Sequence, residues 1–222
     1  MARWQALKQL VPADVHDGPI SIDPQSWTAL GEDLFARYAA PQRVYHSPSH
    51  VLSVLHVLAT LCHPQPPTLA VQLAAFFHDA IYDPTATPNE NELQSARLAT
   101  ESLGALGVHA CVVTAVASLI EATAGHVVNG SPGCPEFLDA DLCILGSAEG
   151  AYDTYAQAIR AEYSHVPDAA FRSGRAAILH RFLNRDMLFY TAAGRGMYEE
   201  QARKNLAREI QRLEEGGRAQ GF

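Results

Sequence analysis

Three segments of the chain supply histidine and aspartate, the residue types that ligate divalent metal ions. Tyr45-His46-Ser47-Pro48-Ser49-His50 and His78-Asp79 supply the imidazoles, and carboxylates follow at Asp139 and Asp141. A histidine, a His-Asp pair and a later aspartate give two imidazoles and two carboxylates. Such a set could hold one divalent ion and leave positions open for water and a substrate.

The surroundings of these residues decide between a metal site and a structural role. His78-Asp79 directly follows the apolar run Leu73–Phe77, so the pair emerges from a helix that is expected to be buried. An uncompensated charge would be costly there, which favours ligands over a solvated face. On a helix the two side chains diverge by about 100°, so both can reach an ion on one side. Asp139 and Asp141 point about 200° apart, so only one of them faces inward, and the residues alone leave open which one.

One familiar metal motif is excluded. His46 and His50 have the four-residue spacing of a zinc metalloprotease helix. No glutamate follows His46, however, and Pro48 interrupts the segment, so this chemistry is not predicted.

Composition limits the partners. The 222 residues are 48% hydrophobic, and 24 acidic against 16 basic side chains give a net charge of −8. Nucleic-acid polymers need a clustered positive field and are therefore not expected. The first ten residues lack an apolar leader, and no later stretch reaches about 18 apolar residues, so no membrane partner is expected. The four cysteines form no Cys-x-x-Cys pair and indicate reduced thiols in a cytoplasmic protein.

The elements that must position these residues are helices. Apolar residues recur every three or four positions, and sustained alternation of the strand type is absent from the sequence. We predict one all-α domain, a single-domain helical bundle over residues 1–222, with an N-terminal extension (1–24) and a flexible tail (215–222). Apolar helices such as Phe171–Leu183 could pack within the monomer or in a homodimer. The predicted helices are Trp27–Tyr38, Val51–Leu61, Thr68–Tyr82, Asn91–Leu103, Ala110–Ala124, Phe137–Leu145, Tyr152–Tyr163, Phe171–Asp186 and Tyr198–Leu213.

The ordered set of His50, His78-Asp79 and Asp141 resembles the HD superfamily of metal-dependent phosphohydrolases. Six motifs between Arg43 and Ile210 are similar to one bacterial branch of that superfamily, whose substrate is unassigned. They are Tyr45-His46-x-x-x-His50, His78-Asp79-Ala80-Ile81-Tyr82, Asn91-Glu92-Leu93-Gln94-Ser95-Ala96, Asp139-Ala140-Asp141-Leu142-x-Ile144-Leu145-Gly146, Ile159-Arg160-Ala161-Glu162-Tyr163 and Ala202-Arg203-Lys204-Asn205-Leu206.

The resemblance implies an HD-type helical bundle with His50, His78, Asp79 and Asp141 as the metal ligands. It favours Asp141 over Asp139, because Ala-Asp-x-x matches how the last family aspartate is usually set. Two histidines and two aspartates accommodate Mn²⁺, Fe²⁺, Co²⁺, Ni²⁺, Zn²⁺ or, less comfortably, Mg²⁺.

The catalytic assignments also come through the resemblance. Tyr45-His46-x-x-x-His50 is similar to the Tyr-His-Asn-x-x-His segment of the cyclic-nucleotide phosphodiesterases, whose first histidine protonates the leaving group. By that analogy His46 is a general acid. Ser47 replaces the Asn here, and the activity of those enzymes is not inferred. Asp79 is expected to contact both the metal and the water.

Three further residues are candidates around this set. Glu92, 13 residues after Asp79, could accept a proton or hold a second ion, or be an ordinary charge in a first helical turn. Arg43 is a candidate phosphate clamp, because guanidinium binds phosphate with two parallel hydrogen bonds. His126 could extend the site towards the substrate, as extra histidines do in two-metal HD proteins, or favour the end of a helix through its dipole.

The expected function is hydrolysis of a small phosphoester, such as a nucleotide or related phosphomonoester. Two alternatives remain. The domain could bind a metal and a nucleotide as a non-catalytic regulatory module, or it could carry a di-iron oxygenase centre with Glu92 and His126 as ligands of the second metal.

Overall fold

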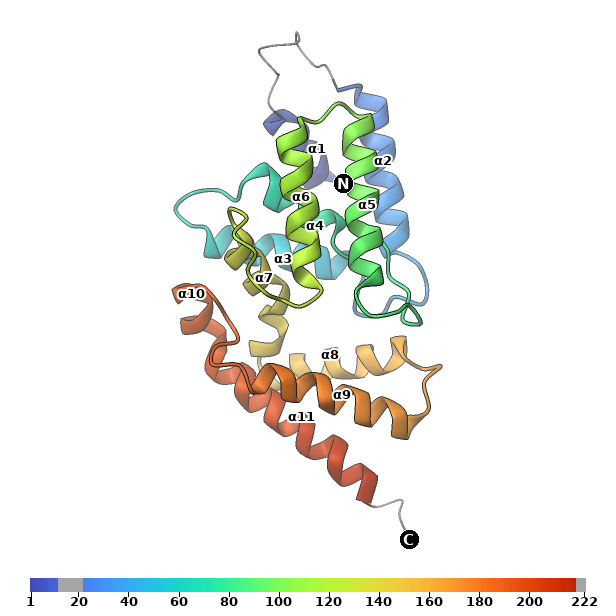
Figure 1. Ribbon diagram of the computed structural model, residues 1–222, viewed down its shortest axis with the longest axis vertical. Helices are drawn as coiled ribbons and strands as arrows, with labels where there is room; N and C mark the ends of the chain where they lie inside the picture. Colours follow the sequence, from blue (N-terminus) through green and yellow to red (C-terminus); the bar gives the residue numbers. More distant parts are fainter. Residues whose placement is uncertain (12–21, 219–222) are drawn as a thin grey trace. The chain divides into compact units, whose positions relative to one another are not determined.

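The structure is a computed structural model that describes residues 1–11 and 22–218, and all regular elements in these ranges are helical (Figure 1). The predicted all-α fold is therefore confirmed. The chain forms two compact units, Met1–Leu138 and Asp139–Phe222. A single domain over 1–222 stays a prediction, and residues 12–21 of the predicted extension and 219–222 of the predicted tail lie outside the described residues. No helix in the described ranges combines the length and the apolar composition that a membrane crossing needs.

The first unit is organised around α4 (Leu69–Phe77), which packs against α1, α3, α5 and α6. Leu73, Ala74, Ala75 and Phe77 of this helix are fully buried. Polar side chains that follow Phe77 therefore emerge directly from the core. The other helices of this unit are α1 (Ala2–Leu7), η1 (Lys8–Leu10), α2 (Pro24–Tyr38), α3 (Pro48–Leu61), α5 (Glu90–Ala105), α6 (Ala110–Thr123) and the beginning of α7 (Cys134–Leu142).

Two tryptophans join α1 to α2. The rings of Trp4 and Trp27 stack with centroids 4.5 Å apart. Each indole N–H donates to the backbone carbonyl of the other residue, at 2.8 Å from Trp4 and 3.1 Å from Trp27. Gly31 permits this packing, since a Cβ there would lie 2.3 Å from Cδ1 of Trp4. The beginning of the predicted N-terminal extension is thus part of the first unit's core.

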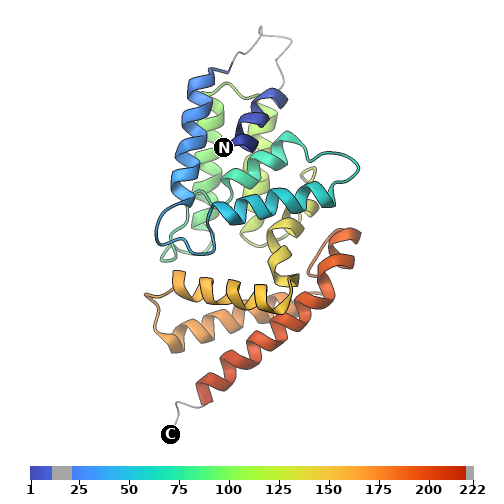
Figure 2. The same ribbon diagram turned by 180° about the vertical axis from the view of Figure 1, so that it is seen from behind.

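The second unit has an apolar core of its own, to which Leu145, Tyr152, Leu188, Phe189 and Leu206 contribute. Helix α11 packs along α9 and η2 (Figure 2). The helices of this unit are η2 (Cys143–Gly146), α8 (Glu149–Glu162), α9 (Asp168–Leu183), α10 (Ala192–Gly194), the π-helical turn η3 (Arg195–Glu199) and α11 (Glu200–Arg218).

One helix boundary differs from its prediction in a way that matters for the site. The predicted helix Thr68–Tyr82 ends at Phe77, so Asp79 lies in a turn rather than on a helix. The Asp79 N–H donates to the hydroxyl of Tyr38, and the Asp79 carbonyl accepts from Arg43. These long-range partners replace the i→i−4 bonds that would have extended the helix.

Candidate metal centre

The first candidate ligand, His50, lies in the first turn of α3. Ser47 precedes the helix with extended backbone, and Pro48 takes its first position. Proline is favourable there because the first N–H groups of a helix have no helical partner. The His50 N–H donates to the Ser47 carbonyl at 3.0 Å, and the residue is only 5% exposed. The helix start therefore holds a buried imidazole in place.

The second and third candidate ligands come from the end of α4. The His78 N–H donates to the Ala74 carbonyl at 2.9 Å, which completes the last turn of the helix. His78 is 1% exposed, whereas the Asp79 side chain is 19% exposed. The N–H of Asp79 donates to Tyr38 Oη at 3.2 Å. The pair thus joins a buried imidazole to a carboxylate that solvent can reach.

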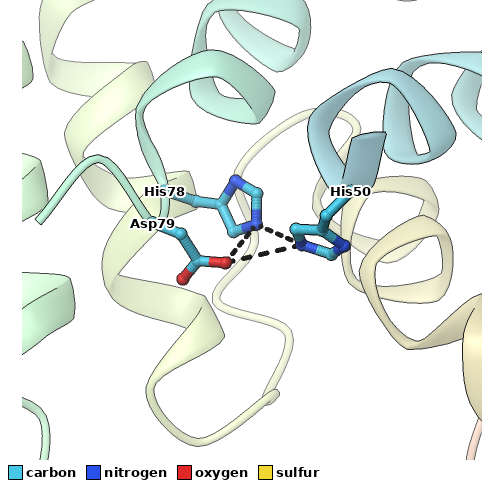
Figure 3. Close-up of side chains that lie close together, drawn as sticks. All are labelled: His50, His78 and Asp79. Atoms are coloured by element: carbon cyan, nitrogen blue, oxygen red, sulfur yellow. Dashed lines mark hydrogen bonds and ion pairs between the residues drawn. The ribbon is translucent and has the colours of Figure 1, made fainter. Parts of the chain in front are cut away.

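The three side chains converge on one point (Figure 3). Nε2 of His50 lies 3.0 Å from Nε2 of His78. Oδ2 of Asp79 lies 3.1 Å from the His78 nitrogen and 3.4 Å from the His50 nitrogen. Donors around a tetrahedral ion with bonds of about 2.1 Å are about 3.4 Å apart. The group formed by His50, His78 and Asp79 therefore has the composition and spacing to hold a divalent ion.

A backbone carbonyl orients the His78 ring. Nδ1 of His78 lies 3.1 Å from the carbonyl oxygen of Ala75, and this bond requires the proton on Nδ1. Nε2 is then the atom that faces the centre, where its lone pair is available to a metal once it is deprotonated. Histidines that ligate metals typically donate the N–H of their other ring nitrogen to such a carbonyl or to a carboxylate. The ring of Phe137 packs edge-on against His78, with centroids 5.8 Å apart, and limits its rotation.

The carboxyl group of Asp79 is held in its ionised form. Burial by itself would raise its pKa, but the charges of His78 and His46 and hydrogen bonds from His50 and His78 hold the pKa well below its ordinary value. Metal ligation requires a deprotonated carboxylate. Asp79 is therefore ready to bind a cation at neutral pH.

His46, the predicted general acid, lies beside this group. Its ring centroid is 5.8 Å from that of His50 and 4.2 Å from that of Tyr82, on which it lies at an interplanar angle of 32°. Tyr45 contacts both histidine rings, at 5.0 Å from His46 and 4.9 Å from His50. The aromatic neighbours hold the half-buried imidazole next to the candidate ligands.

Glu92 lies in the first turn of α5, on the face that meets the turn after Asp79. Asn91 makes two hydrogen bonds with the backbone of Asp83, at 2.9 and 3.0 Å, and Ser95 Oγ accepts from the Ile81 N–H at 3.0 Å. Residues three apart share a helix face, so Glu92 lies on the same side as Ser95. It is half-buried and is not one of the three converging donors.

His126 follows the end of α6 in a left-handed conformation, with φ at 47°. The His126 N–H donates to the Thr123 carbonyl and the Val127 N–H to the Ala122 carbonyl. This is the Schellman arrangement, which usually has glycine at the left-handed position. The structure thus explains the backbone at His126. A role in substrate binding stays a prediction.

Asp139 and Asp141 lie on α7, in the second unit. Asp139 is completely buried, and its Oδ1 accepts from the Tyr190 N–H at 2.7 Å. Its Oδ2 accepts from the N–H and the hydroxyl of Thr191 at 2.8 and 2.7 Å. Both oxygens of Asp139 are therefore engaged in holding the segment before α10. Asp141 is half-buried, and its part in metal binding stays a prediction.

One residue next to the ligands had no signal in the sequence, and a second one makes contacts that the sequence did not predict. Tyr38 reads as one more apolar position of a helix, and its role as acceptor for Asp79 depends on residues 41 positions apart. Arg43 was expected to meet a phosphate, but its guanidinium is buried and donates to the backbone carbonyls of Asp79 and Ala80.

Comparison with known proteins finds no match: no family model, no curated protein and no solved structure is similar to this chain. The all-helical architecture and the group of His50, His78 and Asp79 are compatible with an HD-type fold.

Proposed function

We propose that the protein is a metal-dependent phosphohydrolase of the HD type that acts on a small phosphoester, such as a nucleotide or a related phosphomonoester. The observation that carries the proposal is the convergence of two imidazole nitrogens and one carboxylate oxygen, with separations of 3.0 to 3.4 Å. The six motifs that resemble the HD superfamily support the same chemistry.

His50, His78 and Asp79 would hold the ion, with Asp141 as the predicted fourth ligand. Imidazole and carboxylate donors suit Mn²⁺, Fe²⁺, Co²⁺, Ni²⁺ and Zn²⁺. When bound, such an ion supplies Lewis acidity, which makes water more acidic and offsets charge on phosphoryl oxygens. The turn after α4 would supply the carboxylate of the centre, and the two buried histidines would supply imidazole nitrogens.

His46 is the proposed proton donor to the leaving oxygen. Its ring contacts both the His50 and the Tyr82 rings, so it is held at the edge of the group of ligands. Imidazole changes its protonation near neutral pH, which suits general acid catalysis. Glu92, on the face of α5 that meets the turn after Asp79, is the proposed acceptor for the proton of the attacking water.

The test is the metal content of the full chain, measured by plasma mass spectrometry after incubation with Mn²⁺ and gel filtration. We expect at least one ion per chain in the wild type and none in His78→Ala. His56→Ala is the matched control, because His56 is an exposed histidine on α3 away from the group, and it should keep the metal.

Phosphate release from a panel of nucleoside monophosphates then separates catalysis from binding. Turnover that His78→Ala abolishes and His56→Ala preserves supports the hydrolase. A wild type that binds metal, is thermally stabilised by nucleotides and releases no phosphate would instead indicate the regulatory module. A wild type without metal would contradict the proposal altogether.

A further inference from the structure

Arg43 connects the two segments that carry the candidate ligands. It lies in the loop between α2 and α3, three residues before His46, and is 9% exposed. Its Nη1 donates to the Asp79 carbonyl at 2.5 Å and lies 3.5 Å from the His46 carbonyl. Its Nη2 donates to the Ala80 carbonyl at 2.9 Å. One guanidinium thus bonds to the backbone on both sides of the site.

The backbone that Arg43 contacts needs such partners. Asp79 and Ala80 follow the end of α4, so their carbonyl groups have no helical N–H partner, and a buried carbonyl without a donor costs free energy. The turn after α4 is therefore held by side chains from other parts of the first unit: Tyr38 at the Asp79 N–H, Arg43 at the Asp79 and Ala80 carbonyls, and Ser95 at Ile81.

Aromatic faces hold the guanidinium itself in place. Its central carbon lies 5.1 Å from the ring centroid of Tyr38 and 5.5 Å from that of Tyr82. Such cation–π contacts suit a planar guanidinium. A lysine ammonium is a compact point charge, and it cannot meet two successive carbonyls and two rings in the same way. The site therefore uses the shape of arginine as well as its charge.

We propose that Arg43 is a positioning residue of the metal centre, which sets the distance between the loop that leads to His50 and the turn that carries His78 and Asp79. It acts through the backbone of Asp79, not on the phosphate of the substrate. The inference rests on the proposed metal site. Replacement of a residue that orients the ligands of a metal typically lowers the metal affinity 10- to 100-fold.

The test uses Co²⁺ binding to the metal-free full chain, followed by the visible absorption of the ion, which reports its coordination geometry. We expect Arg43→Met and Arg43→Lys to weaken Co²⁺ binding by about 10- to 100-fold and to change the absorption bands. Arg43→Lys retains the positive charge, so a loss in this variant points to the geometry of the guanidinium.

The matched control is Arg160→Met in the second unit. Arg160 also donates to two backbone carbonyls, those of Tyr163 and Val166 at 2.7 and 3.1 Å, and lies 4.7 Å from the ring centroid of Phe171. Arg160 also forms an ion pair with Asp168 at 2.6 Å, so its loss should lower stability while it leaves the Co²⁺ affinity and spectrum as in the wild type. This comparison separates a general loss of stability from an effect on the centre.

The outcomes are distinguishable. Arg43 variants that fold, as circular dichroism shows, and bind Co²⁺ like the wild type overturn the inference alone. A wild type that binds no Co²⁺ overturns the proposed function and the inference with it. If Arg43→Met does not fold, Tyr38→Phe removes the acceptor for the Asp79 N–H and keeps Arg43. Unchanged Co²⁺ affinity in both Tyr38→Phe and Arg43→Lys would then overturn the inference.

Discussion

Replacement of Asp139 by asparagine should destabilise the protein and leave the proposed metal site of His50, His78 and Asp79 intact. The buried carboxylate accepts three hydrogen bonds, one from Tyr190 and two from Thr191. An asparagine keeps one oxygen and brings an NH₂ group against the remaining donors, so one or two charge-assisted bonds are lost. At about 1.5–3 kcal/mol for each such bond, we expect the free energy of unfolding to fall by about 3 kcal/mol.

The assay is denaturant unfolding followed by circular dichroism, together with metal content. Asp141→Asn is the paired variant, and it should lose metal with a much smaller change in stability. A second pair isolates one hydroxyl: Thr191→Val removes the group that donates to Asp139 and accepts from the Gly194 N–H, whereas Thr191→Ser keeps it. The valine variant should cost about 1–2 kcal/mol more than the serine variant. An Asp139→Asn protein that is as stable as the wild type but has lost its metal would refute this reasoning and make Asp139 the ligand.

Three further results are expected. His126→Gly should raise the free energy of unfolding by about 1 kcal/mol, because glycine adopts the left-handed φ of 47° without a Cβ penalty. A thermal scan that shows a less stable variant would contradict this prediction. Gly31→Ala should lower the free energy of unfolding, measured by urea titration, by about 1–3 kcal/mol, since its Cβ would lie 2.3 Å from Trp4. Gly104→Ala has open space around the new Cβ and should be neutral or stabilising. Equal effects of the two substitutions would show that the Trp4 packing is wrong. The lowered pKa of Asp79 stabilises the metal-free fold above the ordinary carboxyl pKa of 3.8, and this contribution is lost as the pH falls through the lower pKa of the folded state. Stability measured from pH 6 to pH 3 should therefore fall more steeply for the wild type than for Asp79→Asn, and parallel curves would refute the assigned environment.

Local features predicted most of the helices. The predicted helix Val51–Leu61 lies within α3 (Pro48–Leu61), and the apolar run Ala110–Ala124 corresponds to α6 (Ala110–Thr123) within one residue. These boundaries are readable because caps and apolar periodicity act between neighbours in the chain. The short helix α1 and the π-helical turn η3 were not predicted, since each is only five or six residues long and depends on what it packs against.

By itself the sequence indicated the all-α architecture and the candidate donors His50, His78 and Asp79, because imidazole and carboxylate groups suit a divalent ion wherever the fold brings them together. Only the tertiary structure decided where α4 ends and where Arg43 points, because their partners lie 36 to 41 residues away. The same holds for Asp139, which is held by a segment 51 residues further along the chain. Helix periodicity alone does not show which of Asp139 and Asp141 faces inward. The physical difference is that a buried carboxylate must find hydrogen-bond donors, and for Asp139 the folded chain provides them at Tyr190 and Thr191.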